Sequence, residues 1–205
     1  MNNEKSSLFA ENAAVGIISG CALCREAKLG IGQSAGYGLV IFRVGNKKNG
    51  WFAALSPKTG GNVKSDFTIQ LMPMQHLTHF SQMESYPKLA ENFGVAFSRL
   101  CKAMVAIMID NEKLLANAGE KNKSVPVATY GKCTTWKEKK EHLHIKIFPF
   151  RGSIGQPYTV DSSFGKKEIF SQNGDKFVKM DPIKKKMISP AVFNNLAKML
   201  IKLLK

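Results

Sequence analysis

Polar and apolar residues alternate in the stretch HLHIKIF, which begins at residue 142. Its apolar members are Leu143, Ile145 and Ile147, and its polar members are His142, His144 and Lys146. Successive side chains of a strand point to opposite faces, so this pattern predicts a strand with one face available for burial. The polar face is then either an ordinary solvated surface or a row of groups that carry chemistry.

Patterns elsewhere predict the other elements. The expected strands, rich in β-branched and aromatic residues, are residues 37–44, 51–56, 67–74 and 124–132. Apolar residues at helical spacing predict a long helix within residues 85–119. The basic segment 165–186 is expected to form loops or a hairpin, and Ser189 followed by Pro190 predicts the start of a closing amphipathic helix. The fold class is therefore α+β.

The chain is strongly basic. It has 30 Lys and Arg residues against 15 Asp and Glu, which gives a formal net charge of +15. Such a charge attracts polyanions such as phosphates, nucleotides, nucleic acid or an anionic membrane surface, although it also serves solubility alone. No run of eighteen or more apolar residues occurs, so we expect no membrane span. The start lacks the positive charge of an export signal, and a cytoplasmic location is expected.

Cys21 and Cys24 form a Cys-x-x-Cys pair, which in a chain without an export signal is typical of metal or redox chemistry. A structural zinc site needs four ligands, and a tight Cys-x-x-Cys turn supplies two of them. The remaining candidates are the chain's four histidines, His76, His79, His142 and His144. These lie far from the cysteines in sequence, which excludes a compact zinc finger. The spacing leaves two interpretations: a zinc site joining distant segments, or a reduced, buried pair of thiols.

The order of these motifs resembles the histidine triad superfamily of nucleotide hydrolases and transferases. The matching features are the Cys-x-x-Cys pair, the segment from Pro73 to His76, a long helix and HLHIKIFP, over roughly residues 20–152. The family signature is His-φ-His-φ-His-φ-φ, where φ is apolar. The resemblance implies an antiparallel sheet of about five strands with a long helix packed across it. Together with the residue pattern, it predicts a flexible start (1–14), a domain of the histidine triad type (15–152) and a basic extension (153–205), outside the resemblance, whose terminal helix packs on the same core.

The resemblance also implies roles for individual residues. His144 stands at the position of the nucleophile that attacks the α-phosphate of a nucleotide and forms a covalent nucleotidyl-histidine intermediate. His142, the first histidine of the signature and part of the catalytic row, completes a structural Zn²⁺ site with Cys21, Cys24 and His76. The implied activity is that of a nucleotide hydrolase or nucleotidyltransferase, similar to diadenosine polyphosphate hydrolases. Its substrate is expected to be a dinucleoside polyphosphate or another nucleotide conjugate.

Lys146 departs from the family pattern, because it stands where the third histidine of the signature is expected. On the same strand face as His144, its ammonium is expected to bind phosphate oxygens and stabilise negative charge in the transition state. Three more basic residues flank the strand and are expected to contact the rest of the substrate: Lys139, Lys140 and Arg151.

A function of another class is also compatible with the sequence. The same fold could serve as a non-enzymatic, basic, zinc-containing domain that binds nucleic acid. Aromatic residues interleaved with basic ones would favour this alternative, and Trp136, Phe148 and Phe150 give it modest support. A homodimer is compatible with either function.

Overall fold

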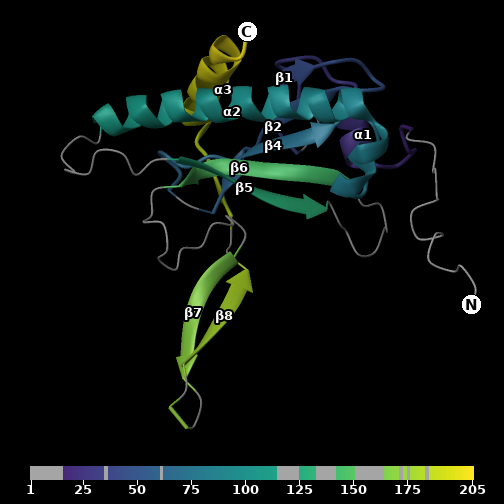
Figure 1. Ribbon diagram of the computed structural model, residues 1–205. Coiled ribbons are helices and arrows are strands. Elements are labelled where there is room, and N and C mark those ends of the chain that lie inside the picture. Colours follow the sequence, from purple (N-terminus) through teal and green to yellow (C-terminus); the bar gives the residue numbers. More distant parts are fainter. Residues whose placement is uncertain are drawn as a thin grey trace, which may run out of the picture.

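The structure is a computed structural model with an α+β architecture (Figure 1). It describes residues 16–34, 37–60, 62–114, 125–132, 142–150, 164–170, 173–174, 176–182 and 185–205. A five-stranded antiparallel sheet has the order β1-β2-β4-β6-β5. Its strands are β1 (Leu39–Val44), β2 (Trp51–Leu55), β4 (Ile69–Pro73), β5 (Val125–Lys132) and β6 (Leu143–Phe150). The long helix α2 (Pro87–Leu114) crosses one face, which confirms the expected α+β class, antiparallel sheet and packed helix.

Smaller elements complete the described chain. They are α1 (Ala22–Glu26), β3 (Lys58–Thr59), the 3₁₀ helix η2 (Phe80–Ser85), β7 (Phe164–Phe170), β8 (Lys176–Pro182), β9 (Lys186–Met187) and α3 (Pro190–Leu203). β7 and β8 pair as an antiparallel hairpin, so the hairpin interpretation of the basic segment is the correct one. Figure 1 shows this hairpin extending away from the side of the sheet that α2 does not cover. β9 pairs with β3 in a separate two-stranded sheet.

The main core lies between the sheet and α2. The apolar residues of β6 that alternate with the histidines, Leu143, Ile145 and Ile147, all belong to it. α2 contributes residues at helical spacing, including Leu89, Leu100, Met104 and Ile107, which have no exposed surface. α3 adds Leu196 and Leu200 to the same core and packs against α2 and β1. The C-terminal helix is thus part of the same packed unit as the sheet.

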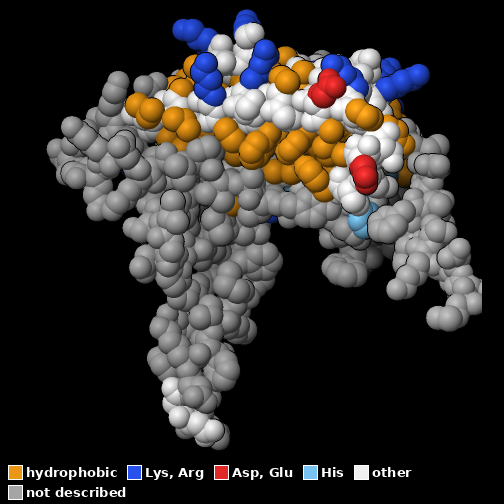
Figure 2. All heavy atoms as spheres, in the orientation of Figure 1, with side chains coloured by type: hydrophobic (Ala, Val, Ile, Leu, Met, Phe, Trp, Pro, Cys, Tyr) orange, Lys and Arg blue, Asp and Glu red, His pale blue; other side chains and the backbone are white. Residues whose placement is uncertain are grey.

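The apolar composition of α2 has a structural explanation. Within the described part of the chain, its segment Pro87–Ile109 is long and apolar enough to cross a membrane by length and composition. Figure 2 shows hydrophobic side chains along the flank of the helix that faces the sheet, and Lys and Arg side chains on its outer surface. Leu100 and Ile107 are buried in the core, whereas Arg99 and Lys102 are exposed. The helix is amphipathic, and its apolar side is used in packing.

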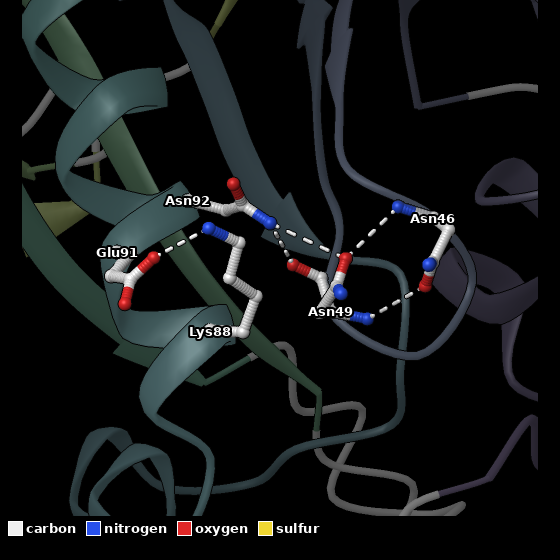
Figure 3. A network of polar contacts seen from close by, with 5 residues as sticks. All are labelled: Asn46, Asn49, Lys88, Glu91 and Asn92. Carbon is white, nitrogen blue, oxygen red and sulfur yellow. Dashed lines mark hydrogen bonds and ion pairs between the residues drawn. The ribbon is translucent and has the colours of Figure 1, made fainter.

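Polar contacts fix the first turns of α2 against the β1–β2 turn. The indole Nε1 of Trp51 donates a buried hydrogen bond of 2.9 Å to the Leu89 carbonyl. One turn further along, the Asn92 side chain donates to the Asn49 carbonyl at 2.8 Å (Figure 3). The turn itself begins at Gly45, whose φ of 73° disfavours residues with a side chain. The helix is therefore held both by apolar packing and by two directed hydrogen bonds.

We expect Asn92→Ala to lower the free energy of unfolding by about 1–2 kcal/mol, because it leaves a half-buried carbonyl without its donor. Glu91→Ala is the matched control. It removes only the exposed ion pair with Lys88, so we expect a loss of less than about 0.5 kcal/mol. Chemical denaturation of both variants measures the difference. Equal losses would show that the Asn92 contact does not hold the helix.

Candidate functional site

The two cysteines are placed by a tight turn at the start of α1. Gly20 adopts a φ of 81°, which turns the chain just before Cys21. The Cys21 thiol then caps the helix by accepting a hydrogen bond from the Cys24 backbone N–H at 3.5 Å. Both cysteines are buried, with exposures of 3% and 0%. The Cys-x-x-Cys spacing thus places two sulfur atoms side by side in an enclosed position.

The two histidines of the cluster come from segments that are distant in sequence. The Leu143 backbone N–H donates to the Leu77 carbonyl at 2.6 Å, which joins the start of β6 to the chain just after β4. His76 and His142 each lie one residue from this bond. Their rings meet edge to face, with centroids 5.0 Å apart. The β4–β6 pairing therefore supplies the second half of the cluster.

The four side chains meet with distances that fit a metal ion. The Cys21 sulfur lies 3.4 Å from Nδ1 of His142, and the Cys24 sulfur lies 3.4 Å from Nδ1 of His76 and 3.6 Å from Nδ1 of His142. All four ligand atoms lie within 4.8 Å of one another. A tetrahedral zinc with bonds of about 2.3 Å to sulfur and about 2.0–2.1 Å to nitrogen holds these ligands about 3.6 Å apart. The cluster could therefore bind a metal ion such as zinc.

The surroundings of the cluster also suit a metal ligand set. Nε2 of His142 lies 3.2 Å from the Pro73 carbonyl. When Nε2–H donates to this carbonyl, Nδ1 keeps the lone pair and points it towards the sulfur atoms. Hydrogen bonds of this kind orient the histidine ligands of metal sites. The hydrogen bond from the Cys24 thiol lowers the pKa of Cys21 to about 3, and the same bond raises the pKa of Cys24. The pair thus shares one proton, which a bound metal ion would displace.

α1 is held against the sheet by a second apolar cluster and by one arginine. Leu23 and Ala27 pack with Phe52 and Met72 on the sheet face opposite α2. The Arg43 guanidinium donates to the carbonyls of Ala27, at 2.9 Å, and Leu29, at the end of α1. This contact satisfies carbonyl groups that a helix terminus leaves without partners. In the sequence, Arg43 stands out only as a single charged residue within an apolar strand.

His144 lies next to the cluster on the same face of β6. Its side chain is only 9% exposed, and His142 has no exposed surface. The interpretation of these two histidines as an ordinary solvated face is therefore wrong. Burial lowers the pKa of His144 to about 4, assisted by the positive charges of Lys146 and Lys185. The imidazole is neutral at pH 7, as a nucleophile or a metal ligand must be.

The tautomer of His144 follows from its backbone neighbour. Nδ1 lies 3.5 Å from the carbonyl of His142, a long contact in which Nδ1–H is the donor. This tautomer places the lone pair on Nε2. A neutral ring with an oriented lone pair can act as a nucleophile or as a general base.

Of the remaining candidate residues, only Lys146 lies beside His144 in the described part of the chain. Lys146 is half-buried and lies level with Gln70 of β4 and Thr129 of β5. Its charge acts on His144, as expected for two residues on one strand face. His79 stands at the start of η2, outside the cluster. Lys139, Lys140 and Arg151 lie outside the described residues.

Comparison of the chain with protein-family models, curated proteins and solved structures gave no match. The inference of function therefore rests on the site and on the sequence resemblance described above.

We expect purified protein to contain about one divalent metal ion per chain, and Cys24→Ser to lose most of it, because a tetrahedral site needs all four ligands. Metal analysis and thermal unfolding measure the two effects. Cys101→Ser is the control, since Cys101 lies in α2, outside the cluster, and this variant should retain its metal. Protein without metal, in which Cys21 and Cys24 are readily alkylated in the folded state, would rule out the site.

Proposed function

We propose that this protein is a nucleotide hydrolase or nucleotidyltransferase of the histidine triad type. In this proposal it acts on the α-phosphate of a dinucleoside polyphosphate or another nucleotide conjugate. The supporting observation is His144, a neutral, buried imidazole between the cysteine–histidine cluster and Lys146. The resemblance of the sequence to the family signature at His142 and His144, and the clustering of the four implied zinc ligands, support the same proposal.

The chemical step begins with attack by Nε2 of His144 on the α-phosphorus. A nitrogen–phosphorus bond forms as the bond to the leaving oxygen breaks, and the nucleotidyl group remains on the ring. The ring then carries a positive charge, which the His142 carbonyl stabilises by accepting from Nδ1–H. Water, phosphate or another acceptor attacks the intermediate in the second step and restores the neutral imidazole. Two easier displacements replace one difficult one.

The metal has a structural role in this proposal. Zinc bound by Cys21, Cys24, His76 and His142 would join α1 to the sheet beside the nucleophile. Its chemistry there is to hold four ligands in fixed positions, which contributes to folding. His142 links the two functions, because its ring belongs to the metal cluster and its carbonyl faces Nδ1 of His144.

Lys146 is proposed to bind the nonbridging oxygens of the α-phosphate. The ammonium approaches from the same face of β6 as His144, two residues along the strand. Such residues are about 6.6–6.8 Å apart, which a lysine side chain can span. A fixed cation at this position stabilises the charge that develops in the transition state.

We expect His144→Ala to abolish formation of the nucleotidyl adduct, measured as the mass of the intact protein after incubation with a panel of nucleotides. His79→Ala is the control, since this exposed histidine lies outside the cluster. Because the pKa of His144 is lowered to about 4, attack should persist below pH 6 and fall only as the pH drops through about 4. An active His144→Ala variant would disprove the proposed nucleophile. Salt-dependent nucleic-acid binding without any adduct would favour the non-enzymatic alternative.

We expect Lys146→Ala to lower kcat by roughly 10²–10³, the effect of removing one electrostatic donor. Lys146→His should restore part of the activity, because it recovers the donor that the family signature carries. Steady-state kinetics at low and high salt test this role. A change in KM alone, and only at low salt, would mean that Lys146 contributes a screened, long-range attraction instead.

A further inference from the structure

The C-terminal extension pairs with the segment that follows β2, in the two-stranded β3–β9 sheet. Lys186 lies opposite Thr59 and Met187 opposite Lys58 in the β3–β9 pair. The next residue, Ile188, donates its N–H to the Pro57 carbonyl at 2.9 Å. The Ile188 side chain is buried in the main core with 3% exposure. Both backbone and side-chain contacts therefore fix the position of the chain just after Lys185.

The register of the sheet shows where this pairing lies relative to His144. β2 and β6 are both antiparallel to β4, so they run in the same direction. Ala54 is level with Lys146 through Gln70. β2 ends one residue later, and the chain then enters β3. The β3–β9 pair thus lies beyond Lys146, at the end of the row opposite to the metal-ligand cluster.

The side of the sheet follows from two further observations. Ile188 is buried in the core beneath α2, and side chains alternate along the extended chain at β9, so the exposed Lys185 points away from that core. The hairpin that precedes Lys185 extends from the side of the sheet not covered by α2 (Figure 1). His144 and Lys146 share that side, because their neighbours in β6 face α2. The order along the face is metal-ligand cluster, His144, Lys146, Lys185.

We infer that Lys185 is a specificity-determining residue, supplied by the C-terminal extension, that selects substrates whose α-phosphate is followed by further phosphate groups. The inference rests on the proposed function, in which His144 and Lys146 hold the α-phosphate. A second cation further along the row then lies where the β- and γ-phosphates extend. Neither the segment 143–149 nor the segment 185–190 contains an acidic residue that would oppose binding of a polyanion. A nucleoside monophosphate would leave this cation without a phosphate partner.

Binding of AMP and of α,β-methylene-ATP, which cannot be cleaved at the α-phosphate, tests the inference on the metal-loaded protein. We expect Lys185→Ala to raise the Kd of α,β-methylene-ATP by about fivefold, the upper range for one exposed ion pair. The Kd of AMP should rise by less than about twofold. Lys186→Ala is the matched control. It removes the same charge from the next residue, and neighbouring side chains of an extended chain point to opposite sides. It should affect both nucleotides weakly and equally, and Lys185→Arg should bind like the parent.

Three results would overturn the inference. If Lys185→Ala and Lys186→Ala weaken nucleotide binding equally, the two lysines contribute only a general electrostatic field. If Lys185→Ala weakens the binding of AMP and of α,β-methylene-ATP equally, Lys185 does not distinguish substrates by their number of phosphate groups. Absence of α,β-methylene-ATP binding to the parent would overturn it as well. Failure of the proposed function is distinguished by the adduct measurement: a protein that binds through Lys185 but forms no adduct on His144 retains the polyphosphate site and lacks the proposed chemistry.

Discussion

The register of β4 against β6 is the constraint on which the candidate site depends. Ile69 lies opposite Ile147 and Leu71 opposite Ile145, and all four side chains belong to the core beneath α2. A shift by one residue would turn every side chain of β6 to the other face and place His144 in that core. Each of these burials contributes about 1.5–3 kcal/mol, so the correct register is strongly preferred. The apolar contacts that hold α2 therefore also determine which face carries the histidines.

The metal-ligand cluster joins parts of the chain that the sheet alone would not hold together. α1 has only five residues, too few for a stable isolated helix. It is kept in place by its apolar contacts with the sheet, by the Arg43 guanidinium and by the two cysteines facing His76 and His142. A metal ion at this point would add bonds between segments that are otherwise linked by weak contacts, and would fix the His142 carbonyl next to His144.

Much of the fold could be predicted, because its strands and long helices have clear periodicity and capping signals. Ser189 accepts from the Val192 N–H, as its position before Pro190 indicates. α1, β3 and β9 were missed because segments of two to five residues have no measurable period. Cys21 and Cys24 of the metal-ligand cluster were found through motif spacing, and His76 and His142 through the family resemblance. The position of Lys185 could not be predicted. It depends on the β3–β9 pairing between residues that are remote in sequence, and Lys185 is one of several basic residues in a row.

The cations beside His144 have two consequences that reinforce each other under the proposed function. A phosphate brought close to an imidazole favours its protonated form, which cannot attack phosphorus. Burial of the ring lowers the pKa of His144, and the positive charges of Lys146 and Lys185 act in the same direction. The same two charges attract the substrate's phosphate groups. A cation that binds a phosphate group therefore also offsets part of the negative charge that the substrate brings to the imidazole. Under the proposed function, the two lysines thus support both phosphate binding and the neutral state of His144, of which burial of the ring is the largest cause.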